Sequence, residues 1–163
     1  VHVRQGTLKE HAVSISVGLP GADRKPYVTW ALLAVNVLVW AVTELDGGSA
    51  DPEVLLRFGA MFGPLIANGE YWRLFTAMFL HVGGMHLALN SVGLFILGVQ
   101  VERLFGHYRF TAIYVLAGLA GSVASYAFNS VGVAAGASGA IFGILGALVA
   151  FFVVGRKLTQ WRH

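Results

Sequence analysis

The sequence contains no cysteine and few charged residues. Without cysteine among its 163 residues, the chain has neither a disulfide framework nor a thiolate metal site. Charged residues make up 12% of the chain, about half of the roughly 25% found in soluble domains. The formal net charge of +3 is small and scattered, which argues against nucleic acid as a partner.

Hydrophobic residues, in contrast, make up 56% of the chain. A soluble core of this chain length cannot absorb so much apolar surface, so the lipid bilayer must solvate much of it. A membrane helix needs about 20 mostly apolar residues, and at least about 17. Four segments without Lys, Arg, Asp or Glu meet this length: 27–43, 81–100, 110–128 and 134–154. We therefore predict an all-α, polytopic membrane helix bundle with about four transmembrane helices.

The placement of the cations predicts how the chain is oriented. If the N-terminus is cytoplasmic, all Lys and Arg residues except Arg57 and Arg73 lie on the inner side. We therefore expect a multi-pass protein of the cell membrane, with a cytoplasmic lead-in at 1–26, an outer loop at 44–80 and a cytoplasmic tail or connector at 155–163. The outer loop mixes aromatic and charged residues, which is typical of short amphipathic helices at the interface or of an ordinary interfacial anchor.

Polar side chains lie within the second span. His86 and Asn90 are four residues apart and therefore share one helix face, and His81 lies at the outer edge of the span. Ionisable groups inside a span usually face the bundle interior or a wet cavity. Ordinary hydrogen bonding between helices also fits this pair, so both interpretations stay open.

Ser138, in the fourth span, has an unusual setting. Gly136 and Gly139 flank it and leave its hydroxyl uncrowded, and Gly139 and Gly143 form a small-residue face for helix packing. Other serines are expected to bond back to their own helices: Ser91, Ser122 and Ser125. Counted from the starts of their spans, His86 and Ser138 both lie about 6 to 8 Å below the outer boundary. This shared depth favours a site that water could reach from outside.

Four motifs within residues 27–154 resemble, in order, those of the rhomboid family of intramembrane serine proteases. They are Glu70-Tyr71-Trp72-Arg73, the His-x4-His-x3-Asn pattern of His81, His86 and Asn90, Glu102-Arg103-Leu104-Phe105-Gly106, and Gly136-Ala137-Ser138-Gly139. Any one could arise by chance, but four in order are specific. The resemblance implies a six-span helical fold that cleaves transmembrane segments of substrate proteins.

The resemblance also implies roles for single residues. Ser138 would be the nucleophile, while His86, Asn90 and the Ser138 backbone N–H would stabilise the oxyanion. Phe142 occupies the place of a family aromatic, often Tyr, that packs against the catalytic imidazole. The resemblance implies structural roles, in the outer loop and in an ion network, for Glu70, Trp72, Arg73 and Glu102. This chemistry requires no metal or organic cofactor.

The general base is the missing part of this interpretation. A serine nucleophile needs an adjacent base, which in the family is a His on the sixth span. This chain begins at Val1 rather than Met and ends at His163, on the inner side together with His107. We therefore expect a truncated rhomboid that is inactive alone. Two alternatives stay open: a catalytically inactive rhomboid-like protein that binds transmembrane helices, and, less favoured, a small transporter.

Overall fold

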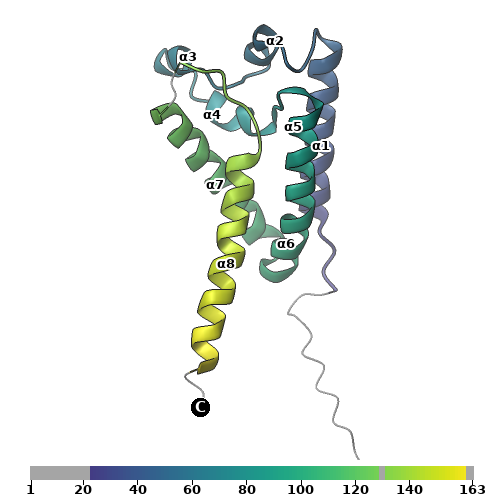
Figure 1. Ribbon diagram of the computed structural model, residues 1–163, viewed down its shortest axis with the longest axis vertical. Helices are drawn as coiled ribbons and strands as arrows, with labels where there is room; N and C mark the ends of the chain where they lie inside the picture. Colours follow the sequence, from purple (N-terminus) through teal and green to yellow (C-terminus); the bar gives the residue numbers. More distant parts are fainter. Residues whose placement is uncertain (1–22, 129–130, 161–163) are drawn as a thin grey trace, which may run out of the picture.

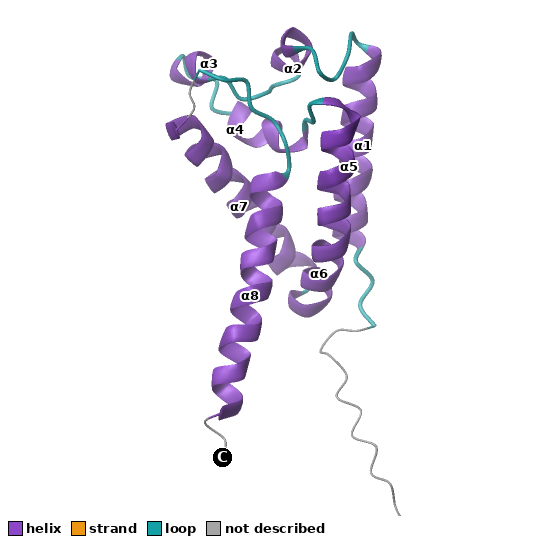
Figure 2. Cartoon of the chain, in the orientation of Figure 1, coloured by secondary structure: helices purple, strands orange, loops and turns teal. Residues whose placement is uncertain are grey.

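A computed structural model describes residues 23–128 and 131–160. Within these residues the secondary structure is helical, with long helices that form a bundle and short helices gathered at one end of it (Figure 1, Figure 2). Three helices are long and apolar enough to cross a membrane: α1 Tyr27–Leu45, the continuous helix Gly83–Phe105 and α7 His107–Phe128. A fourth, α8 Ser138–Gln160, has a shorter apolar part, Ser138–Val154. The predicted polytopic helix bundle is confirmed.

The second long helix changes its winding near its middle. Its first part, α5 Gly83–Gly93, and its last part, α6 Val99–Phe105, are joined by a wide π-turn, η2 Leu94–Gly98. At the end of this turn the helix approaches α1 closely, because a Cβ on Gly98 would lie 3.1 Å from the Thr29 side chain. The helix therefore links the end of the bundle at which α5 begins to the first turn of α1.

Two helix boundaries differ from the sequence-based expectation. The fourth span was expected from residue 134, but α8 begins only at Ser138, because Ala134 pairs with Met61 and Gly136 has a φ of +132°. The second span was expected to end at residue 100, but its helix continues through α6 to Phe105, and Gly106, with a φ of +84°, separates α6 from α7. Residues 1–22 of the expected lead-in and 161–163 of the tail lie outside the described residues.

The segment between α1 and α5 folds into short helices at the end of the bundle where α8 begins (Figure 1). They are α2 Pro52–Arg57, α3 Gly63–Ala67, α4 Arg73–Thr76 and the 3₁₀ turn η1 Ala77–Phe79. Asp51 starts α2 as an N-cap, since its side chain accepts bonds from the N–H groups of Glu53 and Val54 at 2.7 and 3.3 Å. Local capping thus makes this segment a defined structure.

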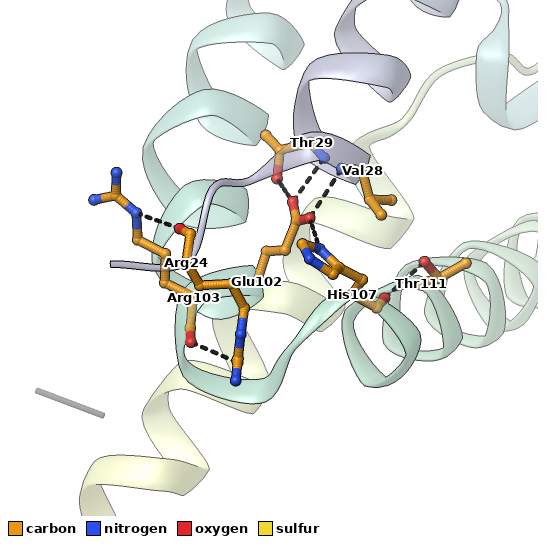
Figure 3. A network of polar contacts seen from close by, with 7 residues as sticks. All are labelled: Arg24, Val28, Thr29, Glu102, Arg103, His107 and Thr111. Atoms are coloured by element: carbon orange, nitrogen blue, oxygen red, sulfur yellow. Dashed lines mark hydrogen bonds and ion pairs between the residues drawn. The ribbon is translucent and has the colours of Figure 1, made fainter. Parts of the chain in front are cut away.

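A buried carboxylate joins α1 to the turn between α6 and α7 at the opposite end (Figure 3). Glu102 is fully buried and accepts hydrogen bonds from the N–H groups of Val28 and Thr29 at 2.9 and 2.8 Å and from the Thr29 hydroxyl at 2.7 Å. His107 Nδ1 lies 2.6 Å from the same carboxylate. Because a negative charge is favourable at a helix N-terminus, Glu102 caps α1. Through its contact with His107 it also connects α1 to α7.

Glycines allow α7 and α8 to pack in close contact. A Cβ on Gly121 would lie 3.0 Å from the Gly139 Cα, and a Cβ on Gly143 would lie 2.0 Å from the Ala117 Cβ. Neither position has room for a methyl group, as expected where small residues bring membrane helices together. The packing face that the sequence predicts at Gly139 and Gly143 therefore contacts α7.

Substitution of Gly143 by Ala should destabilise the bundle, because the added methyl group would overlap Ala117. Overpacking of this kind costs about 1–3 kcal/mol. Thermal unfolding in detergent measures the effect. Gly146→Ala is the matched control on the same helix, since a Cβ there meets no atom within 4 Å. Equal melting temperatures for the two variants would contradict the close α7–α8 contact.

Substitution of Glu102 by Ala should also destabilise the chain, since it leaves the buried N–H groups of Val28 and Thr29 without their acceptor. We expect a loss of about 1–3 kcal/mol or more in the free energy of unfolding. The exposed Glu53 is the control, and Glu53→Ala should cost less than about 1 kcal/mol. A Glu102→Ala protein as stable as the control would show that α1 does not depend on this cap.

Candidate active site

His86 and Asn90 lie one turn apart near the start of α5. The backbone N–H of Val82 donates to His86 Nδ1 at 3.3 Å, so in the neutral ring the proton sits on Nε2. Asn90, which is 7% exposed, donates one Nδ2 hydrogen to the His86 carbonyl at 3.0 Å. An amide nitrogen has two hydrogens, so a second one stays available. The pair therefore offers two donors from one helix face.

The chain just ahead of α8 lies directly against these two donors. A Cβ on Gly136 would lie 2.7 Å from His86 Cε1, 2.9 Å from His86 Nε2 and 3.9 Å from Asn90 Nδ2. Gly136 also has a φ of +132°, a conformation that side chains disfavour. Both constraints require glycine here. The His86 and Asn90 donors thus face the backbone two residues before Ser138.

Backbone hydrogen bonds hold residues 134–136 against the segment between α1 and α5. Met61 and Ala134 exchange two bonds, each of 2.9 Å, and the N–H of Gly136 donates to the Ala77 carbonyl at 2.8 Å. These bonds use the polar groups of an extended backbone that would otherwise need water. The start of α8 is therefore positioned by the short helices between α1 and α5.

Ser138 is the first residue of α8 and is exposed. The sequence placed it about four residues inside its span, whereas the helix begins at Ser138 itself; His86 is the fourth residue of α5. The first N–H groups of an α-helix have no partner within the helix, and its N-terminus has a partial positive charge. The Ser138 hydroxyl therefore lies where backbone N–H groups and a helix dipole can stabilise a negative charge.

A cavity of about 220 Å³ adjoins Ser138 between α7 and α8. His86 and Asn90 are not among its lining residues, whereas Gly136, which packs against the His86 ring, lines it together with Ser138. The lining consists of small residues, three serines and two larger side chains: Ala77, Gly118, Gly121, Ser122, Ser125, Ala134, Ala135, Gly136, Ser138, Gly139, Met61 and Phe142.

Sequence reasoning missed part of this lining. Ser122 and Ser125 were expected only to bond to their own helix, yet both line the cavity. Their spacing of three residues on the α7 face that meets α8 is the signal that could have identified them. Ser91 also differs from the expectation, since its Oγ is buried without a hydrogen-bond partner among the described residues.

Phe142 and His81 lie on different sides of the site. Phe142 lines the cavity one turn after Ser138, and its side chain is 72% exposed. His81, in the turn before α5, is fully buried, and its ring centroid lies 5.4 Å from that of His86. Burial and, to a smaller extent, His86 lower the pKa of His81 to about 4. His81 is therefore a neutral ring that packs next to His86.

Arg73 holds together the segment between α1 and α5, which lies beside the site. Its guanidinium contacts the Glu70 carboxylate at 2.7 Å and donates to the carbonyls of Leu56 and Ala60 at 2.7 and 3.1 Å. The same guanidinium lies 4.6 Å from the ring centroid of Trp72, a cation–π contact. The guanidinium N–H groups of this nearly buried arginine thus join α2, α4 and the turn before Met61.

Comparisons with known proteins agree with these features. Residues 68–161 match the family model described as the Rhomboid domain. Rhomboid protease GluP of Bacillus subtilis (strain 168) is 46% identical over 134 residues, which cover 82% of this chain and 26% of that protein. RHOMBOID-like protein 5 of Arabidopsis thaliana is 43% identical, with 66% of this chain and 34% of that protein covered.

A shorter bacterial relative is covered more fully. Putative rhomboid protease YdcA of Bacillus subtilis (strain 168) is 35% identical over 142 residues, which cover 85% of this chain and 68% of that protein. The chain thus spans only 26% and 34% of the two relatives above, but most of this third one. The resemblance found in the sequence is confirmed, and this multi-pass membrane chain belongs to the rhomboid family.

Proposed function

We propose that the chain forms the part of an intramembrane serine endopeptidase that holds the nucleophile and the oxyanion donors. The observation that supports this most directly is the contact of Gly136 with His86 and Asn90. Ser138 follows Gly136 by two residues, so the negative charge created by its attack on a carbonyl would develop close to both donors. Three relatives that are named as rhomboid proteases or putative rhomboid proteases support the same reaction class: GluP, YdcA and AarA of Providencia stuartii.

The chemistry follows from the groups assembled here. The Ser138 Oγ forms a bond to the carbonyl carbon of the substrate, its proton passes to a general base, and the carbonyl oxygen becomes an oxyanion. His86 Nε2–H, the second Asn90 Nδ2–H and the Ser138 N–H are the proposed donors to this oxyanion. The C–N bond then breaks as the leaving amine takes the proton, and water releases the acyl group by the same steps.

The general base comes, in this proposal, from a helix outside the 163 residues. Of the described histidines, His81 is buried behind His86, and His107 lies at the opposite end of the bundle against Glu102. A histidine on another helix, as the family resemblance implies, would face Ser138 beside the exposed ring of Phe142. The 163-residue chain alone should therefore be inactive.

The substrate class follows from where the site lies. Ser138, His86 and Asn90 are near the ends of membrane helices, so a substrate reaches them as a transmembrane segment that unwinds locally to expose its carbonyls. We propose that this end faces the outside of the cell membrane and that the N-terminus is cytoplasmic, as the cation placement predicts. A catalytically inactive relative would not require Ser138 together with two free donors.

Labelling by a fluorophosphonate tests the nucleophile. In a protein that contains this chain together with the proposed histidine helix, Ser138 should be labelled, and Ser138→Ala should abolish both labelling and cleavage of a membrane substrate. Ser125→Ala is the matched control, because Ser125 lines the same cavity on α7. Persistent labelling of the Ser138→Ala protein, or equal loss with Ser125→Ala, would refute the assignment.

Substitution of Gly136 by Ala tests the oxyanion donors. The new methyl group would displace the His86 ring, and loss of one donor typically lowers kcat by about 10²–10³-fold. Turnover of the same membrane substrate is the measurement. Gly84→Ala serves as the control on α5, since its Cβ would meet the Trp40 ring at an ordinary 3.6 Å. Normal turnover of the Gly136→Ala protein would show that His86 does not act on the reaction.

A further inference from the structure

Four exposed cations gather at the end of the bundle opposite to Ser138. We call them the basic patch; they are Arg24 and Lys25 before α1, Arg103 on α6 and Arg109 on α7. Glu102 brings these elements together by bonding to α1 and to His107 (Figure 3). The patch therefore combines residues that are far apart in the sequence.

The cations of the patch lack acidic partners within the described residues, where the ion pairs are Arg57–Asp46, Arg73–Glu70 and His107–Glu102. Among the residues that the structure describes, the carboxylates near the patch are Asp23, which is exposed, and Glu102, which is buried and already bonded. The other end of the bundle is rich in acids, namely Glu44, Asp46, Asp51, Glu53 and Glu70. The positive charge thus concentrates at one end and is not neutralised there.

The placement of the three arginines in the patch indicates an external anion. Arg109 lies in the first turn of α7, which contains no acidic residue, although a cation is unfavourable at a helix N-terminus. Arg24 and Arg103 are held in place because each donates to the backbone carbonyl of the other, at 2.9 and 3.3 Å. An anion bound here would stabilise charges that the described fold leaves uncompensated.

Exposed aromatic rings surround the patch. Tyr27, Trp30 and Tyr108 have 57, 47 and 91% of their side chains exposed, and the rings of Tyr27 and Trp30 lie edge to face at 6.0 Å. Tyr and Trp are enriched at the level of the lipid head groups, where their rings have an apolar body and a polar edge. Rings of this kind beside the patch favour a lipid head group as the anion that binds there.

We propose that the basic patch binds the phosphate head groups of anionic phospholipids in the leaflet at this end of the bundle. The lipids would neutralise Arg109 and the arginines that flank the Glu102 cap, and so fix the level at which α1 and α7 leave the membrane. This inference is independent of the proposed proteolysis, because it involves no residue of the candidate active site.

Spin-labelled lipids test the proposal with the complete 163-residue chain. The chain is reconstituted in phosphatidylcholine bilayers with a trace of spin-labelled phosphatidylglycerol or, separately, spin-labelled phosphatidylcholine, and electron spin resonance measures the motionally restricted fraction of each. We expect the anionic lipid to associate at least about twofold more strongly than the zwitterionic one. Added salt should reduce this preference, since exposed charges are screened.

Matched variants locate the preference on the molecule. Lys25→Gln combined with Arg109→Gln should bring the ratio of the two lipids close to one; neither side chain makes a hydrogen bond or ion pair within the described residues. Arg57→Gln removes a cation from the other end, where it pairs with Asp46, and should leave the ratio unchanged. Equal association of both lipids with the unmodified chain, or an equal loss with Arg57→Gln, would overturn the proposal.

Discussion

The contact between Gly136 and the His86 ring is the constraint on which the candidate site depends. It requires a residue without a side chain, in a backbone conformation that other residues disfavour, directly beside two hydrogen-bond donors. Three backbone hydrogen bonds to Met61 and Ala77 hold the chain in that position. The short helices before α5, joined by Arg73, therefore control how α8 begins, and with it the position of Ser138.

The two ends of the bundle use polar groups in different ways. At the Glu102 end, the contacts of the carboxylate cap α1 and join it to α7, so this end acts as a fixed anchor. At the Ser138 end, the His86 and Asn90 side chains face the backbone at Gly136, where we propose that they act as donors to a substrate. The apolar middle joins them, with glycines where α7 meets α8. Helix capping and the proposed chemistry thus occupy opposite ends of the same helices.

The sequence predicted the helix bundle and the family well, because long apolar runs and the spacing of motifs do not depend on tertiary contacts. It predicted the start of α8 wrongly, since Ala134 and Ala135 are as apolar as the helix that follows and only pairing with Met61 makes this stretch extended. The cavity and its Ser122 and Ser125 lining could not be derived from hydropathy, because they depend on which faces of α7 and α8 meet. The roles proposed for Ser138, His86 and Asn90 remain predictions.

The most direct test is an experimental structure of a protein that contains this chain, with Ser138 phosphonylated by a fluorophosphonate. The phosphonyl oxygen mimics the oxyanion, and the account predicts that it lies about 2.7–3.1 Å from both His86 Nε2 and Asn90 Nδ2. An adduct whose oxygen points into the cavity between α7 and α8, away from both side chains, would contradict the account.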